Sequence, residues 1–179
     1  MVGNFIADHV KGRSFARYGP GIAEGITMHR AIDDFSDTHP LVRQSAERLR
    51  PRYGRYGSVI VDIFYDHFLA SNWPQYSPTP LAAFAEQTYQ LLQRNEAMLP
   101  ENSKRFLGYA RQYDILTAYA QVEAIERVML GMSRRAKFVS GMEYATEELN
   151  AFYLEFAAEF AQFFPDLQAF IAGQTWKSS

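Results

Sequence analysis

Residues 57–71 have the sequence GSVIVDIFYDHFLAS, and this stretch decides the fold class because its apolar side chains recur every three or four positions. That spacing matches the 3.6-residue period of an α-helix and not the two-residue alternation of a half-buried strand. The apolar positions are Val59, Ile60, Ile63, Phe64, Phe68 and Leu69. The stretch therefore predicts a helix with one face in the core, within which Asp62, Asp66 and His67 stand out as polar.

The same period continues on both sides of this stretch, and prolines and glycines mark the expected helix ends. Pro20, Pro40 and Pro80 fit first helical turns, where a missing N–H costs nothing. We predict helices over residues 3–11, 20–36, 39–50, 57–71, 80–97, 102–112, 114–133, 137–164 and 165–173. No sustained β alternation is present, so the predicted fold is all-α, an irregular helical bundle. We expect residues 1–179 to form a single domain.

The composition narrows the classes of partner and compartment. Aromatic residues make up 15% of the chain, and we assign them to a core rather than to a surface that stacks nucleic acid. A stripe of that core is expected at Phe152, Phe156, Phe160, Phe163 and Phe164. The absence of cysteine excludes thiolate ligands and nucleophiles. No apolar run approaches the roughly 18 residues of a membrane span, and no signal peptide is evident, so we expect a cytoplasmic protein without a membrane partner. The oligomeric state is left open.

The charged residues are distributed unevenly although the net charge is only −2. One segment has five arginines against the single acid Glu47, namely Arg43, Arg48, Arg50, Arg52 and Arg55. This segment could attract an acidic partner, or it could be an ordinary solvated helix face. A second basic cluster at Arg134 and Arg135 could bind phosphate, or could favour a helix C-terminus through the macrodipole.

The Asp and His residues predict a metal site. His29, Asp33 and Asp37 are spaced i, i+4 and i+8, so they lie along one helix face at about 6 Å of rise per step. Asp62 and Asp66 repeat the spacing, and His67 adjoins them. One imidazole with several carboxylates suits Mg²⁺ or Mn²⁺, with Zn²⁺ or Fe possible. The alternative is structural: Arg30 could neutralise Asp33 or Asp34, and His67 could be a hydrogen-bonded core histidine.

Two further residues have weaker signals. Asp8 lies in an apolar helix start, where it could be another ligand or a general base. His39 precedes Pro40 at an expected helix start, which favours a capping or solvent-exposed role over metal binding. The sequence has no phosphate-binding glycine loop and no nucleophile elbow.

Together these motifs resemble the acyl carrier protein phosphodiesterase family. The resemblance spans most of the chain and lies in an ordered set: Gly3-Asn4 through Asp8, Val10-Lys11-Gly12, Gly25-Ile26, His29-Arg30, Ile32-Asp33, Asp37, His39-Pro40, Asp62, Asp66-His67-Phe68-Leu69-Ala70, Trp73 and Gly131-Met132-Ser133-Arg134-Arg135. It implies hydrolysis of the phosphodiester that links 4′-phosphopantetheine to a serine of holo acyl carrier protein, with Mn²⁺ or Mg²⁺, on a fold distantly similar to HD-type metal phosphohydrolases. Members usually carry a further N-terminal segment with a histidine, which the resemblance implies is missing here, so the activity of this form is left open.

Carried over by position, the resemblance makes His29, Asp33, Asp66 and His67 metal-site candidates, with Asp37 and Asp62 as further ligands. The order Asp66-His67 reverses the His-Asp pair that names the HD group. Asp8 would orient or deprotonate the attacking water, and Arg30 or Arg134 would neutralise charge on the phosphoryl oxygens.

The substrate-binding groups expected from the resemblance are arginines, with Arg134 and Arg135 on phosphate or carrier protein and Arg43 and Arg48 steering the acidic carrier protein. Two other functions remain open: an HD-like phosphohydrolase of nucleotides or other small phosphodiesters, and a catalytically degenerate module that only binds the carrier protein.

Overall fold

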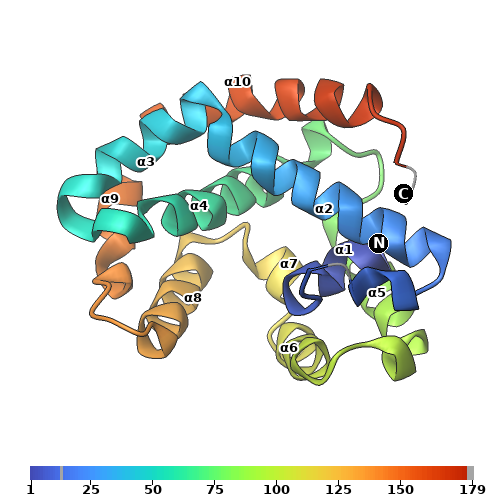
Figure 1. The fold of residues 1–179 in the computed structure, drawn as a ribbon. Coiled ribbons are helices and arrows are strands. Elements are labelled where there is room, and N and C mark those ends of the chain that lie inside the picture. The colour runs from blue at the N-terminus through green and yellow to red at the C-terminus, as the bar shows by residue number, and fades with distance from the viewer. Residues whose placement is uncertain (13, 177–179) are drawn as a thin grey trace.

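The computed structural model describes residues 1–12 and 14–176, and every regular element within them is a helix (Figure 1). The α-helices and the short 3₁₀-helices (η) are α1 (Val2–Ile6), η1 (Ala7–His9), η2 (Ser14–Arg17), α2 (Pro20–Thr38), α3 (Pro40–Tyr53), η3 (Gly54–Tyr56), α4 (Gly57–Ser71), η4 (Trp73–Gln75), α5 (Leu81–Arg94), η5 (Glu96–Met98), α6 (Glu101–Gln112), α7 (Ile115–Ala118), α8 (Val122–Arg135), η6 (Met142–Tyr144), α9 (Ala145–Ala151) and α10 (Tyr153–Ala172). The all-α prediction is confirmed. Among these helices, none has the length and apolar character that crossing a membrane would require.

The helix that decided the fold class, α4, has the predicted bounds. Its apolar face is buried, and Ile60, Val61 and Phe64 have no exposed surface. The Phe64 ring meets Phe156 of α10 edge to face, with 5.2 Å between ring centroids. The predicted phenylalanine stripe of α10 supplies most of the opposing surface, because Phe156, Phe160 and Phe163 are all buried.

Two helices continue through a proline at which a helix end was predicted. Helix α3 passes Pro51 and ends at Tyr53, and α10 passes Pro165 and ends at Ala172. Both prolines are exposed, so water can bond the carbonyl oxygens that lose a helical partner. The predicted ends at residues 50 and 164 were therefore wrong. The stop signal of α3 is Gly54, which adopts a positive φ of 54°.

Four other predicted helices were too long, and the one predicted over residues 80–97 is α5, which ends at Arg94. Helix α1 ends at Ile6, and a 3₁₀ turn follows it. Residues 119–121 separate α7 from α8 within the predicted helix 114–133. Residues 136–141 are not helical, because Gly141 adopts a positive φ of 69° that turns the chain into η6 and places Met142 in the core.

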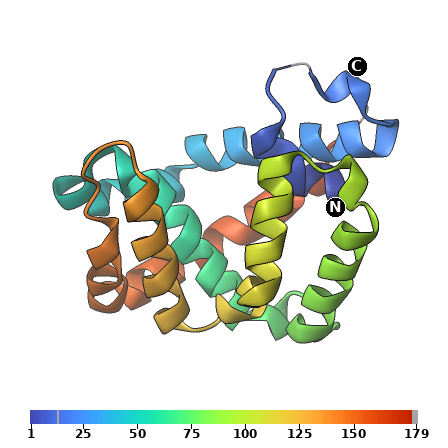
Figure 2. The ribbon, with the colours of Figure 1, turned by 90° about the horizontal axis from the view of Figure 1, so that it is seen from below.

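The buried side chains form two hydrophobic clusters that are bridged by long helices. One cluster gathers α3, α4, α8, α9 and α10 around Phe64, and the other gathers α1, α2, α5, α6 and α7 around Ile26. Figure 2 shows α8 and α9 at one end of the molecule and α5 and α6 at the other, with α4 running diagonally between them. The Tyr119 ring packs against both clusters. The distant similarity to HD-type phosphohydrolases stays a prediction.

The start of α3 is fixed by a histidine cap, as the sequence favoured. His39 is the N-cap residue, and its Nδ1 accepts a hydrogen bond from the Leu41 N–H at 3.3 Å. Its Nε2 lies 3.3 Å from a carboxylate oxygen of Asp166 on α10. This histidine therefore joins α3 to α10.

Helices α1 and α2 touch through their backbones at two glycines. A Cβ added to Gly3 would lie 2.0 Å from the carbonyl oxygen of Ile22, and one added to Gly25 would lie 3.0 Å from the Cα of Gly3. Real Cβ atoms do not approach backbone atoms as closely as 2.0 Å, so no larger residue fits at position 3 without moving a helix. This contact fixes the position of the C-terminal end of α1, and of the residues that follow it, relative to α2.

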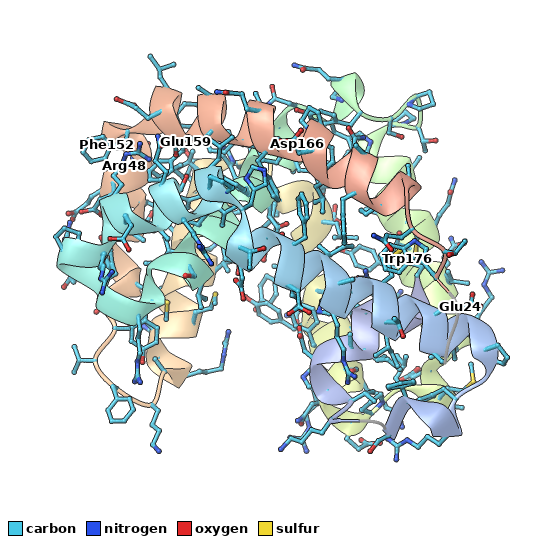
Figure 3. The ribbon with its side chains drawn as sticks, turned by 45° about the horizontal axis from the view of Figure 1, so that its top comes forward. Glu24, Arg48, Phe152, Glu159, Asp166 and Trp176 are labelled. Atoms are coloured by element: carbon cyan, nitrogen blue, oxygen red, sulfur yellow. The ribbon has the colours of Figure 1, made fainter. Side chains whose placement is uncertain are left out.

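A buried carboxylate joins α3 to α10. Glu159 is only 4% exposed and accepts two hydrogen bonds from the Arg48 guanidinium, at 2.8 and 2.5 Å, as well as one from the Ser45 hydroxyl and one from the Gln44 amide (Figure 3). Burial alone would raise the pKa of Glu159, but the hydrogen bonds from Arg48 and Ser45 outweigh it and lower the pKa. Arg48 is therefore engaged inside the protein.

We predict that Gly3→Ala lowers the free energy of unfolding by about 3 kcal/mol, because the new methyl group overlaps backbone rather than a flexible side chain. Urea denaturation followed by circular dichroism measures the change. Gly108→Ala is the matched control, since position 108 of α6 has open space around it and a helical Gly→Ala change is expected to stabilise by about 0.5–1 kcal/mol. A Gly3→Ala protein as stable as wild type would contradict the close crossing.

Arg48→Ala should lower the free energy of unfolding at pH 7 by about 3–5 kcal/mol, because it leaves a buried carboxylate without its cation. The deficit should shrink as the pH falls toward 4, where Glu159 of the variant is protonated and no longer needs a partner. Arg50→Ala, which breaks only an exposed pair with Glu47, should cost less than about 0.5 kcal/mol. Equal stability of the two variants would show that Glu159 does not depend on Arg48.

Candidate metal centre

Three of the predicted site residues lie together where α1 crosses α2. Asp8 comes from η1, and His29 and Asp33 stand one turn apart on α2. The Nε2 atom of His29 lies 3.2 Å from Oδ1 of Asp8 and 3.2 Å from Oδ2 of Asp33. The three potential ligand atoms all lie within 4.8 Å of one another, the only such group found among residues 1–12 and 14–176. We call Asp8, His29 and Asp33 the triad.

The triad is open to solvent on its carboxylate side. The side chains of Asp8 and Asp33 are 77% and 53% exposed, whereas the His29 ring is 21% exposed. An open arrangement of this kind admits both a hydrated ion and a large substrate. The donor set, one imidazole nitrogen and carboxylate oxygens without sulfur, fits Mn²⁺ or Mg²⁺ better than a soft metal.

The pKa shifts of the triad residues show how their side chains interact in the absence of a metal. The hydrogen bond between Asp8 and His29 lowers the pKa of the Asp8 carboxyl and raises the pKa of the His29 imidazole. Burial raises the pKa of Asp33, and the neighbouring carboxylates of Asp8 and Asp37 add to the rise. A single Nε2–H cannot make a short hydrogen bond to two carboxylates at once, whereas a cation at this point would satisfy both.

Further carboxylates extend from the triad onto α4. Burial raises the pKa of Asp62 to about 6, with smaller contributions from Asp37 and Asp33, and it raises the pKa of Asp66 to about 7, with a contribution from Asp62. Both aspartates are nonetheless exposed to solvent, so their raised pKa values come from residues packed around an open carboxylate and not from enclosure in the core. Within residues 1–12 and 14–176, no ion pair neutralises Asp37, Asp62 or Asp66. We call Asp33, Asp37, Asp62 and Asp66 the acid row.

The structure places His67 in the core, apart from the triad. The residue is 2% exposed, its Nδ1 lies 2.9 Å from the Tyr119 carbonyl oxygen, and its Nε2 lies 3.0 Å from the Tyr153 hydroxyl. A neutral ring that donates through Nδ1 and accepts through Nε2 satisfies both contacts. Burial lowers the pKa of this imidazole, which agrees with the neutral form. The alternative of a hydrogen-bonded core histidine describes His67 in this structure.

Arg30 is held against the chain that follows Asp8. Its guanidinium donates to the carbonyl oxygens of Val10 at 2.6 Å and Gly12 at 2.8 Å, and it lies over the Phe15 ring. Both terminal nitrogens are therefore engaged, and the side chain does not pair with Asp33 or Asp34. In this position Arg30 ties residues 10–12 to the helix that carries His29.

The four arginines predicted to bind phosphate or carrier protein have different surroundings. Arg48 pairs with Glu159, and Arg43 donates through Nε to the Asp37 carbonyl oxygen at 3.1 Å. Arg134 and Arg135 are exposed at the C-terminal end of α8, in the other half of the molecule from the triad. None of the four is brought to the triad.

Asp8 is held in place by contacts that the sequence pattern alone does not show. Gly3 and Gly25 do carry a signal, because a glycine inside a helical pattern costs about 1 kcal/mol and so suggests a close contact. Two contacts to α6 also flank Asp8: the His9 Nδ1 lies 2.8 Å from the Ser103 hydroxyl, and the Phe5 and Phe106 rings stack with 5.8 Å between centroids. No sequence signal connects these residue pairs.

Comparison with known proteins identifies the family of the chain. A family model described as acyl carrier protein phosphodiesterase matches residues 1–167. A protein of that name from Photorhabdus laumondii subsp. laumondii is 32% identical over 166 residues, which cover 92% of this chain and 84% of the relative. Another of that name from Salmonella agona is 33% identical over 173 residues, which cover 94% of this chain and 88% of the relative. No solved structure matches the chain at a significant level. The chain belongs to the acyl carrier protein phosphodiesterase family.

Proposed function

We propose that this protein hydrolyses the phosphodiester that links 4′-phosphopantetheine to the serine of holo acyl carrier protein, with a divalent cation held by the triad. Family membership supports the reaction. The observation that supports the site is the convergence of Asp8, His29 and Asp33, with ligand atoms within 4.8 Å, on an exposed surface. Asp37, Asp62 and Asp66 are proposed as further ligands, because they continue the triad as unpaired carboxylates.

The metal, Mn²⁺ or Mg²⁺, would supply Lewis-acid polarisation of the phosphodiester and of water. The chain's own groups would do the rest. His29, Asp33 and one carboxylate oxygen of Asp8 would hold the cation, and the other carboxylate oxygen of Asp8, the most exposed of the three residues, would accept the proton of the attacking water. The water oxygen bonds to phosphorus, the bond from phosphorus to the serine oxygen breaks, and that oxygen takes a proton. The products are apo carrier protein and 4′-phosphopantetheine.

Arg30 is proposed as a positioning residue rather than a group that touches the phosphoryl oxygens. Its two hydrogen bonds to carbonyl oxygens of residues 10 and 12 keep the segment after Asp8 against α2. These bonds use one N–H of each terminal nitrogen, and breaking them would release the segment that presents Asp8.

The proposed activity is tested by incubating holo acyl carrier protein with this protein and Mn²⁺ and by following the apo form by mass spectrometry. The proposal expects apo carrier protein and free 4′-phosphopantetheine, and no product after chelation with EDTA. A rate on free nucleotides that exceeds the rate on holo carrier protein would instead indicate a small-phosphodiester hydrolase. Carrier-protein binding without turnover would indicate a binding module.

Asp33→Asn should weaken Mn²⁺ binding by at least about 100-fold, because loss of even an outer-shell partner of a metal site costs about 10–100-fold in affinity. Titration of Mn²⁺ followed by electron paramagnetic resonance measures the affinity directly. Asp34→Asn is the matched control, since Asp34 is the exposed next residue on α2 and lies outside the triad. Similar Mn²⁺ affinities of the two variants would remove Asp33 from the site.

The metal-free protein should lose thermal stability as the pH rises from 5 to 8. The pKa values of Asp62 and Asp66, about 6 and 7, are raised above the unfolded value, so folding favours their protonated forms and this stabilisation disappears as they ionise. A divalent cation should restore the melting temperature at pH 8 more than at pH 5, because it competes with protons for the same oxygens.

The variants Asp62→Asn and Asp66→Asn separate this effect from general pH dependence. Asparagine mimics the protonated side chain, so both metal-free variants should melt at a higher temperature than wild type at pH 8 and at a similar temperature at pH 5. Differential scanning calorimetry at the two pH values gives the comparison. Variants that melt below wild type at pH 8 would show that the acid row does not destabilise the metal-free fold.

A further inference from the structure

The connection between α8 and η6, residues 136–141, presents an apolar tip to solvent. The Val139 side chain is 100% exposed and the neighbouring Phe138 is 54% exposed. Single exposed apolar residues are common on protein surfaces, so their surroundings decide whether they matter. Here both residues belong to one short turn, which we call the 136–141 tip.

The base of the 136–141 tip is fixed. Ser140 is buried and its hydroxyl donates to the Ser133 hydroxyl at 3.2 Å, while the N–H of Met142 donates back to the Ser140 oxygen at 3.4 Å. Met142 is itself 3% exposed in the core, and the Tyr56 hydroxyl donates to the Phe138 carbonyl oxygen at 3.5 Å. The exposed side chains are thus held out from an ordered support, which reduces the entropy lost on binding a partner.

Positive charge surrounds this tip. The Arg55 guanidinium lies 4.5 Å from the centroid of the Phe138 ring, and the Lys137 ammonium lies 5.5 Å from it. Arg134 and Arg135 end the helix that leads into the tip. In the part of the chain that the structure describes, none of these four cations forms a salt bridge.

The acids closest in sequence to the tip have other partners. Glu147 and Glu148 both bind Arg52, whereas the Glu143 carboxylate accepts a hydrogen bond from the uncharged Ser133 hydroxyl and so remains one negative charge beside the four cations. The tip therefore combines an exposed aromatic and an exposed aliphatic side chain with an excess of positive charge, although the whole chain has a net charge of −2.

We propose that the 136–141 tip, with Arg55, Arg134 and Arg135, is a docking surface for an acidic protein partner that offers an apolar contact to Phe138 and Val139. The charges would be complementary, and buried aromatic and arginine side chains are the commonest anchors of protein interfaces. This inference rests on the proposed function, which makes the acyl carrier protein itself the partner. Figures 1 and 2 place the tip and η1 in different lobes but toward the same edge of the molecule.

The test uses two variants: the single variant Val139→Asp, and a double variant that combines Arg55→Glu with Lys137→Glu. Both are assayed on holo carrier protein and on bis(4-nitrophenyl) phosphate. Val139 is fully exposed, so its replacement should leave the fold intact. We expect KM for holo carrier protein to rise at least about tenfold in each variant, with kcat and the small-diester rate unchanged. The rise in KM with salt should be weaker in the charge variant than in wild type.

Leu154→Asp and Arg94→Glu are the matched controls, because Leu154 is 79% exposed on α10 and Arg94 is exposed on α5. The proposal is overturned if KM is unchanged in the tip variants or rises equally in the controls. It is also overturned if the tip variants lose only binding to vesicles of anionic phospholipid, which would assign the tip to a membrane surface.

Binding of apo carrier protein, measured by isothermal titration calorimetry, separates this inference from the proposed function. If wild type binds apo carrier protein, the tip variants do not, and no variant shows turnover, the docking surface is supported and the proposed hydrolysis fails. Turnover by wild type with equal binding in the tip variants would leave the hydrolysis standing and contradict the docking surface.

Discussion

Two helices contact each other through backbone atoms at Gly3 and Gly25, and the candidate site depends on that contact. Asp8 lies just beyond the end of α1, so its distance from His29 is set by how closely α1 approaches α2. A side chain at Gly3 would force the helices apart, because its Cβ would lie 2.0 Å from the Ile22 carbonyl oxygen, and the 3.2 Å contacts within the triad would not survive such a shift unchanged. The hydrogen bonds of Arg30 to the carbonyl oxygens of residues 10 and 12 hold the same segment from its other side.

The protein places its carboxylates in two contrasting environments. Glu159 is buried with its own arginine and several other hydrogen-bond donors, which lower its pKa and make it part of the packing between α3 and α10. Asp62 and Asp66 have no such cation, and their pKa values are raised to about 6 and 7. A fold gains nothing from such unpaired carboxylates in the absence of a ligand. Their arrangement beside the triad supports the proposed cation site.

The sequence predicted local features well and long-range contacts poorly. The period of residues 57–71 predicted α4, and the spacing of His29 and Asp33 predicted that they share a helix face. Whether His67 binds metal or packs in the core could not be decided from sequence, because its partners Tyr119 and Tyr153 are 52 and 86 residues away. For the same reason, the sequence could not distinguish Arg48 from the neighbouring arginines, because its partner Glu159 lies 111 residues away. The helix ends predicted at Pro51 and Pro165 were wrong, and both prolines lie at exposed positions where water can bond the freed carbonyl oxygens.

Anomalous diffraction from crystals grown with Mn²⁺ tests the central claim most directly. The account predicts an anomalous difference peak within coordination distance of Asp8, His29 and Asp33, about 2.0–2.3 Å from their ligand atoms, as in oxygen- and nitrogen-bound metal sites. A Mn²⁺ ion bound elsewhere in the protein, or no peak at a saturating concentration of the ion, would contradict it.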